Sequence, residues 1–407
     1  MPITWKKSKN LKPAVILDSI AAIRSVNPGG APSFSGFGLE DDLPALQSML
    51  DFPVVANEVQ RSTLVWKALA SISGELTPKT FLAAINDTLS QQIATREAQF
   101  HILTALSIAP QGLPAQTRID GSTLKLLNKP YPRKYAARVS AVAARRLPVE
   151  STPDDYCRVI VTVTAKSYFG AMTKALRTLD IQRAIWCLMC NSQMEIIGQE
   201  WNPINVIRLG SIHTVHNPDG SLASQEFWFE PNFKRALIFR HDRVDMFRKN
   251  STFALRALSR CPCPYKSALT DALLRYVRAL DERDQNTAFI RLWGAIEALT
   301  SPGFANYDQI VRRCSFLFRD RQYHQQILEH LREYRNQSIH AGDQSDKAKT
   351  HCFQLQLYFY HLIWFHLENV GFFTSLEEAN AFLDLAPSKT TLLRSRQLVQ
   401  KAIRFVS

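Results

Sequence analysis

The sequence predicts a multidomain, mainly α-helical fold, in which a small α/β module lies between an N-terminal helical region and a C-terminal helical bundle. A chain of 407 residues is too long for one typical core, so two or three domains are expected. Apolar residues recur with helical spacing over most of the chain, whereas β-branched runs and turn residues gather in its middle. The predicted units are residues 1–115, 116–250 and 265–407.

The first unit is expected to be mostly helical. Pro78 occupies a position typical of the first turn of a helix, directly after Thr77. Amphipathic patterns predict helices at 14–25, 42–50, 54–72 and 77–106. No residues in this unit have a spacing that indicates catalysis.

The second unit combines strands with one long helix. Asp120-Gly121 predicts a hairpin turn, and an alternating β-branched run predicts a strand at 156–165. Further elements are expected as a helix at 168–194 and strands at 204–209, 212–216 and 226–229. The aromatic run Phe227-Trp228-Phe229 suits the core of a sheet, and exposed it could stack on bases.

A basic stretch lies within this second unit. Its charged residues alternate with Ala and Val, which predicts a solvated helix face, with an RNA-facing patch as the second interpretation. The basic residues are Arg133, Lys134, Arg138, Arg145 and Arg146. The net charge of +13 favours an acidic partner such as nucleic acid, although a basic protein with scattered charges has the same total.

Cysteine usage and hydropathy predict a reduced, cytoplasmic protein. There are seven cysteines, an odd number, and no apolar leader follows the N-terminal residues. The most apolar run, 352–373, is interrupted by polar residues, so a buried helix is expected and no membrane partner. Cys187/Cys190 and Cys261/Cys263 lie about 70 residues apart, further than structural zinc sites space their pairs. No metal and no cofactor are therefore expected.

The last unit is predicted to be a helical bundle that follows a boundary at 251–265. Helical patterns cover 267–280, 287–300, 307–318, 322–341 and 346–370. Gly371 is expected to end the last of these helices, and Ser375 to Glu378 resembles a capping box that opens another.

The helix expected at 322–341 carries a polar motif near its end. Its apolar stripe consists of Leu328, Leu331, Tyr334 and Ile339. At about 100° per residue, Arg332, Asn336 and His340 fall in one row with Arg335 beside it. A guanidinium forks onto phosphate oxygens, and an imidazole titrates near neutrality. The row could therefore hold a phosphate and move a proton.

This motif resembles the Arg-x4-His signature of HEPN domains (higher eukaryotes and prokaryotes nucleotide-binding), in which a residue such as Asn336 often follows the arginine. A second stretch, Phe289–Leu299, resembles the first helix of the ApeA-like HEPN branch, where an aromatic-x-Ala-x-Glu-Ala-Leu pattern recurs. The resemblance covers about residues 270–370. It implies a metal-independent endoribonuclease that acts as a homodimer or a higher even oligomer, often as a toxin or in antiviral defence.

The resemblance also implies roles for residues. Arg335 would hold the phosphate, His340 would transfer protons and Asn336 would orient one of them, giving 2′,3′-cyclic phosphate and 5′-hydroxyl ends. Arg332 and Glu297 would support the site, with Glu297 either paired to Arg335 or on a helix surface. Residues 1–250 would bind a regulatory partner or trigger. The alternative is a non-catalytic RNA-binding or dimerisation protein that keeps a HEPN scaffold.

The same Arg-to-His spacing recurs at Arg96/His101, Arg208/His213 and Arg319/His324. Short motifs carry that risk of chance matches, so context must separate them. The Arg335 pair lies late in a long helical pattern, whereas the Arg319 pair lies in a charged junction between two patterns. Arg335/His340 is therefore preferred, with Arg319/His324 as the competing pair.

Overall fold

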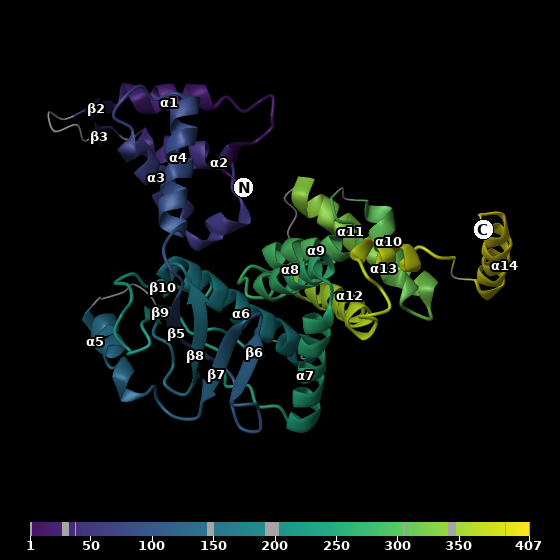
Figure 1. The fold of residues 1–407 in the computed structure, drawn as a ribbon. Coiled ribbons are helices and arrows are strands. Elements are labelled where there is room, and N and C mark those ends of the chain that lie inside the picture. Colours follow the sequence, from purple (N-terminus) through teal and green to yellow (C-terminus); the bar gives the residue numbers. More distant parts are fainter. Residues whose placement is uncertain are drawn as a thin grey trace.

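The computed structural model describes residues 2–26, 32–36, 38–144, 150–191, 203–303, 306–340, 347–386 and 388–406, and leaves the side chains of Val26 and His340 undescribed. Helices take up 57% of the chain and strands 13%, which confirms the mainly α-helical expectation. Figure 1 shows an N-terminal group of helices, a sheet with the long helix α6 along it, and a larger group of helices towards the C-terminus.

The N-terminal helices form a core of their own. The helices are α1 (Pro13–Ala22), α2 (Leu39–Ser48), α3 (Arg61–Ser71) and α4 (Pro78–Ile93), with short elements β1 (Thr4–Trp5), β2 (Arg24–Val26), β3 (Pro32–Phe34), β4 (Leu50–Asp51) and η1 (Val54–Glu58) between them. Leu17, Leu64 and Phe81 are fully buried in this core. The Thr77 side chain accepts a hydrogen bond from the backbone N–H of Thr80, which caps α4, and Pro78 lies in the first turn as predicted.

The helix predicted at 77–106 is wrong in its second half. It ends at Ile93, and residues Ala98–Leu106 form strand β5 instead. A short apolar run cannot be assigned to helix or strand by its periodicity alone, and here pairing on both sides of the run decides for a strand. The sheet therefore begins at Ala98, before the boundary expected near residue 115.

The sheet has six antiparallel strands in the order β10-β9-β5-β8-β7-β6. The remaining strands are β6 (Gln116–Ile119), β7 (Ser122–Leu127), β8 (Cys157–Ala165), β9 (Ile212–His216) and β10 (Trp228–Phe229). The predicted hairpin turn is confirmed, with positive φ angles of 47° at Asp120 and 80° at Gly121. The strand predicted at 204–209 is absent from this described stretch except for one bridge between Leu106 and Leu209.

Helix α6 (Tyr168–Cys190) covers one face of the sheet and joins it to the C-terminal helices. Ala171, Ala175 and Leu179 of α6 are fully buried in a core that continues into α8 (Cys263–Ala279) and α9 (Gln285–Thr300). Helix α7 (Val244–Arg260) occupies much of the stretch 251–265, where a domain boundary is expected, and buries Ala254 and Leu258 in the same core. Cys261-Pro262 only separates α7 from α8, since a residue before proline disfavours helical angles.

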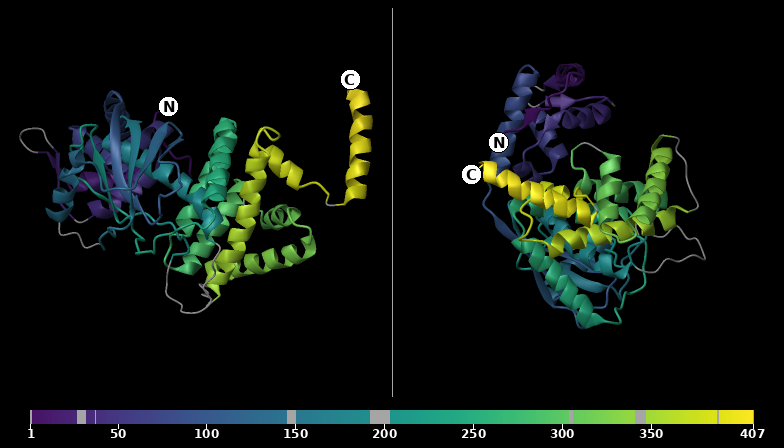
Figure 2. Two further views of the ribbon diagram at one scale, coloured as in Figure 1. Left: turned by 90° about the horizontal axis from the view of Figure 1, so that it is seen from below. Right: turned by 90° about the vertical axis from the view of Figure 1, so that its right-hand side faces the viewer.

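The remaining helices complete the C-terminal group. They are α10 (Tyr307–Phe316), α11 (Arg321–His340), α12 (Ala348–Glu368), α13 (Leu376–Leu383) and α14 (Lys389–Val406). The predicted turn at Gly371 (φ 96°) and the Ser375 cap of α13 are confirmed. Figure 2 shows α14 standing apart from the other helices, and none of its described residues is buried.

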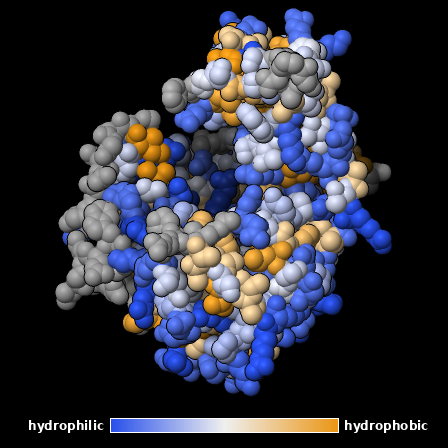
Figure 3. Space-filling model, turned by 90° about the vertical axis from the view of Figure 1, so that its left-hand side faces the viewer, coloured by the Kyte–Doolittle hydropathy of each residue, from blue (hydrophilic) through white to orange (hydrophobic). Residues whose placement is uncertain are grey.

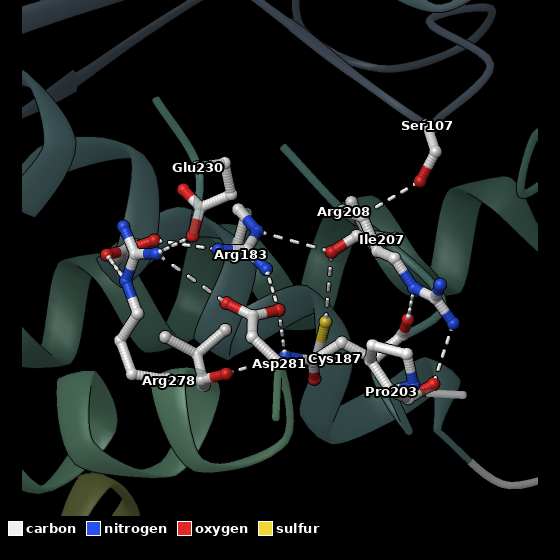
Figure 4. Close-up of polar contacts among 12 residues, drawn as sticks. Ser107, Arg183, Cys187, Pro203, Ile207, Arg208, Glu230, Arg278 and Asp281 are labelled. Carbon is white, nitrogen blue, oxygen red and sulfur yellow. Dashed lines mark hydrogen bonds and ion pairs between the residues drawn. The ribbon is translucent and has the colours of Figure 1, made fainter. Parts of the chain in front are cut away.

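A cluster of buried charges lies where α6, α8 and the residue after β10 meet (Figure 4). We call Asp180, Arg183, Glu230, Arg278 and Asp281 the central ion cluster. Arg183 donates to Asp180 at 2.8 Å and to Asp281 at 2.6 Å. Arg278 donates to Asp180 at 2.6 Å and to Glu230 at 2.5 Å. The cluster thus binds the sheet module to the C-terminal helices through charged side chains whose burial no sequence pattern predicted.

Candidate functional site

Helix α11, which carries the predicted motif, is fixed by a cap at its start and by packing against α9 and α10. The Asp320 carboxylate accepts a hydrogen bond from the Tyr323 backbone N–H at 3.2 Å, which caps the start of α11. Leu328 and Leu331 are fully buried against α9 and α10. Ile339, expected in the same apolar stripe, is 42% exposed because it lies beyond the packed part of the helix.

Tyr334 anchors the end of α11. Its hydroxyl donates to the side-chain oxygen of Asn286 on α9. Its ring centroid lies 4.8 Å from that of Phe289 and 4.5 Å from that of His351 on α12. Since Tyr334 is fixed by α9 and α12, the backbone of the neighbouring residue Arg335 is fixed as well.

Arg335 is positioned without being neutralised. Its guanidinium carbon lies 4.8 Å from the centre of the Tyr307 ring, within the range of a cation–π contact. Its Nη1 donates to Asn336 Oδ1 at 3.3 Å. Among the described residues, no carboxylate lies within ion-pair distance of this guanidinium. No carboxylate of the described residues therefore offsets this half-buried cation, which could bind an anionic ligand.

Arg332, one turn earlier, is in a different state. Its Nη1 lies 2.7 Å from Asp308 Oδ1 and 3.1 Å from Glu329 Oε2. These two carboxylates offset its charge, so Arg332 is less suited to bind a phosphate than Arg335. The two arginines look equivalent in the sequence, and the fold distinguishes them.

His340 is the last residue of α11, and its side chain lies outside the described part of the structure. Its backbone follows that of Asn336 by one helical turn, a rise of about 6 Å. Gly342, expected to cap the helix, also lies outside the described residues. The structure thus brings Arg335 and Asn336 into contact and places the backbone of His340 next to them.

Glu297 lies on another side of the bundle. It borders a cleft of about 370 Å³ between α8 and α9, together with Asp271 and Arg275. No ion pair between Glu297 and Arg335 is found among the residues that the structure describes. This placement fits the helix-surface interpretation of Glu297 rather than a direct pairing.

The competing Arg-to-His pairs have other surroundings. His324 lies 3.9 Å from the Phe318 ring, its Nδ1 is 3.0 Å from the Tyr358 hydroxyl, and burial lowers its pKa. Arg319 precedes α11 and is exposed. His101 lies on strand β5, where its Nδ1 meets the Tyr135 hydroxyl at 2.7 Å. His213 lies on β9 and bonds Thr104, so neither strand histidine has a helical motif around it.

The basic stretch in the second unit forms η2 (Arg133–Tyr135) and α5 (Ala137–Ala144). Arg133 is exposed, and Lys134 donates to the Pro218 carbonyl at 2.6 Å. Arg138 points at the sheet, where it donates to Thr214 Oγ1 at 3.1 Å and to the Ile212 carbonyl at 3.0 Å. Arg145 and Arg146 lie outside the described residues. Arg138 therefore stabilises the packing of α5 on the sheet and does not belong to the RNA-facing patch considered from the sequence.

The cysteines give no sign of a metal centre within the described chain. All seven are free thiols, and burial raises the pKa of Cys187 to about 12. In that part of the molecule, no three His, Cys, Asp or Glu side chains lie close enough to share a metal ion. Nor does any helix built from described residues have the length and apolar character needed to cross a membrane.

The sequence reasoning missed a basic cleft that lies against α12. Its signal was the charged stretch from Lys234 to Arg243, but no local pattern indicates that Lys349 lies beside it. Comparisons with models of protein families, with curated proteins and with solved structures found no match to this chain.

Proposed function

We propose that this protein is a metal-independent endoribonuclease of the HEPN type, with Arg335, Asn336 and His340 as its catalytic residues. One observation carries the proposal, namely that Arg335 is fixed over Tyr307 and beside Asn336 without a carboxylate partner among the described residues. A cation in that state can bind a phosphate at full charge, since a guanidinium does not deprotonate.

RNA supplies its own nucleophile in this reaction. The ribose 2′-hydroxyl loses its proton to a base and its oxygen bonds to the adjacent phosphorus. The bond from phosphorus to the 5′-oxygen breaks, and an acid protonates that oxygen. The products are a 2′,3′-cyclic phosphate and a 5′-hydroxyl. Arg335 would stabilise the negative charge that grows on the phosphate oxygens, and His340 would transfer protons.

The reaction needs a base and an acid, while the motif on one copy of α11 includes a single histidine, His340. A two-fold pairing of α11 with its copy would provide both, as the family resemblance implies. Ile339, exposed beside the motif, is an apolar residue that such a pairing would cover. A homodimer is therefore part of the proposal.

The matched pair Arg335 and Arg332 gives the sharpest test. Purified protein is incubated with total RNA in EDTA, and new ends are labelled through their 5′-hydroxyls. We expect Arg335→Ala and His340→Ala to reduce cleavage by about 10²-fold or more, the usual effect of losing a transition-state donor or an acid–base group. Arg332→Ala removes the same type of side chain from the same helix and should retain most of the activity.

Cleavage that survives both active-site substitutions, or that depends on a divalent metal, would refute the proposal. RNA that is bound in a salt-dependent manner but never cut would support the alternative, a non-catalytic RNA-binding protein on a HEPN scaffold. The net charge of +13 is compatible with both functions. A role as a toxin or in defence, with residues 1–250 receiving a trigger, rests on the family resemblance alone.

A further inference from the structure

A cleft of about 820 Å³ lies between the end of α6, the segment 234–243 and the first turns of α12. Its charge is strongly one-sided. The only carboxylate among its described lining residues is that of Asp242. The cationic lining residues are Arg208, Lys234, Arg235, Arg240, Arg243 and Lys349. The volume falls in the range of ligand-binding clefts, and the charge calls for an anionic ligand.

The arginines of the cleft divide into two kinds. Arg208 donates to the carbonyls of Pro203, Asn205 and Lys234, so it builds the wall of the cleft. The side chains of Arg235, Arg240 and Arg243 are exposed, and among the described residues none of them has a carboxylate within ion-pair distance. These three guanidinium groups are therefore available to a ligand.

The walls also carry flat and apolar side chains. Phe239, Ile238 and Leu237 come from the segment that bears the arginines, and Phe353 comes from α12. Cations interleaved with aromatic rings are typical of surfaces that bind single-stranded nucleic acid, since phosphates pair with the cations and bases stack on the rings.

The first turns of α12 lie between the cleft and the end of the candidate active-site helix. Lys349 and Phe353 are one turn apart on α12 and both line the cleft. His351, on the other side of the same turn, contacts the Tyr334 ring at 4.5 Å. The first turns of α12, about 10 Å across, thus have the cleft on one side and the end of α11 on the other.

We propose that this basic cleft binds the phosphodiester backbone of single-stranded RNA and thereby holds the substrate close to Arg335. The inference rests on the proposed nuclease function for its purpose, but binding itself can be tested without cleavage. The same chemistry would also suit a free nucleotide, so the experiment includes both ligands.

Binding is measured by fluorescence anisotropy of a labelled single-stranded RNA of about 12 nucleotides, a length within the range of known single-strand sites. The salt dependence is recorded for the full-length protein and for the double variant Arg240→Gln/Arg243→Gln. Each phosphate contact with a single strand contributes about 0.7 to the slope of log K against log salt, so the double variant should lose about 1.4.

Arg256→Gln is the matched control. Arg256 is exposed on α7, about 20 Å along the helix from Arg243, and does not line the cleft. The variant Arg256→Gln should leave the slope of log K against log salt unchanged. Asp242→Asn removes the one carboxylate among the described lining residues and should tighten RNA binding, a gain that structural damage would not produce.

The outcomes separate the two proposals. Wild-type RNA binding with the expected slope change but without cleavage would sustain the cleft and defeat the nuclease. In an active enzyme, the double variant should raise KM several-fold and leave kcat close to its original value, because Arg240 and Arg243 would bind the substrate away from the reacting bond. A slope equal to that of Arg256→Gln would overturn the cleft proposal. So would ATP binding that is tighter than RNA binding and lost in the double variant.

Discussion

Replacing Arg183 with methionine should destabilise the junction between the sheet module and the C-terminal helices. Arg183 is 0% exposed and donates to Asp180, to Asp281 and to the carbonyl of Ile207. Without it, Arg278 would be the one arginine left within ion-pair distance of Asp180, Asp281 and Glu230 among the described residues. Methionine is uncharged and fills the space of the aliphatic part of the arginine side chain, so the change removes the ion pairs while limiting the cavity.

The magnitude follows from the two charged hydrogen bonds that are lost. Each is worth about 1.5–3 kcal/mol, and leaving one member of a buried ion pair unpaired typically costs about 3–5 kcal/mol. We therefore expect the free energy of unfolding to fall by about 4 kcal/mol. Because the central ion cluster joins the sheet module to the C-terminal helices, both parts of the fold should unfold at a lower urea concentration.

Urea unfolding at pH 7, followed by circular dichroism and by tryptophan fluorescence, measures the effect. Arg248→Met is the control, since Arg248 and Asp245 form a surface pair whose side chains are 50% and 89% exposed. That pair should be worth less than about 1 kcal/mol. If Arg183→Met lowered the stability no more than Arg248→Met does, the structural role assigned to the central ion cluster would be refuted.

Two further predictions concern charges inside the fold. Burial disfavours the charged form of Glu230, but His213 and Arg278 outweigh it and lower the pKa of Glu230 to about 2 from 4.5. A lowered pKa stabilises the fold above pH 4.5, so wild type should be more stable than Glu230→Gln there by on the order of 3 kcal/mol. This difference should shrink as the pH falls from 4.5 towards 2, because Glu230 then becomes protonated. Thermal melts across this range measure the difference, and a constant value would contradict the assignment. The Asp384 carboxylate accepts hydrogen bonds from Arg313 at 2.6 and 2.9 Å and so connects the end of α13 to α10. Asp384→Ala should therefore lower the free energy of unfolding in urea by about 2 kcal/mol. An unchanged urea midpoint would show that this contact is dispensable.

The elements that the sequence predicted correctly depend on neighbours close in the chain. Strand β8 follows from its alternating β-branched residues, and α13 follows from the Ser375 cap. The motif helix α11 follows from the spacing of Leu328, Leu331 and Tyr334, all of which are buried as expected. The predictions differ from the structure where an apolar or amphipathic run fits more than one kind of structure. Residues 98–106 were expected in a helix and form β5, and part of the stretch expected as a boundary forms α7.

For the candidate site, the sequence supplied the motif but not the state of its charges. Arg332 and Arg335 are the same residue type on one helix, and only the approach of Asp308 on α10 offsets one of them. Arg138 was expected at the surface, yet its guanidinium donates hydrogen bonds to Ile212 and Thr214 of the sheet. The choice of partner for a long charged side chain depends on elements that the chain brings from elsewhere.

The order of residues by itself determined the helical character of the chain, the caps and turns, and the Arg-Asn-x3-His arrangement on α11, because each arises from contacts within a few positions. The tertiary structure alone decided that Ala98–Leu106 pairs as a strand, that Arg183 is enclosed by carboxylates, and that Lys349 lines the same cleft as the cations of 234–243. The physical reason is that pairing, burial and charge balance depend on groups far apart along the chain, which only the fold brings together.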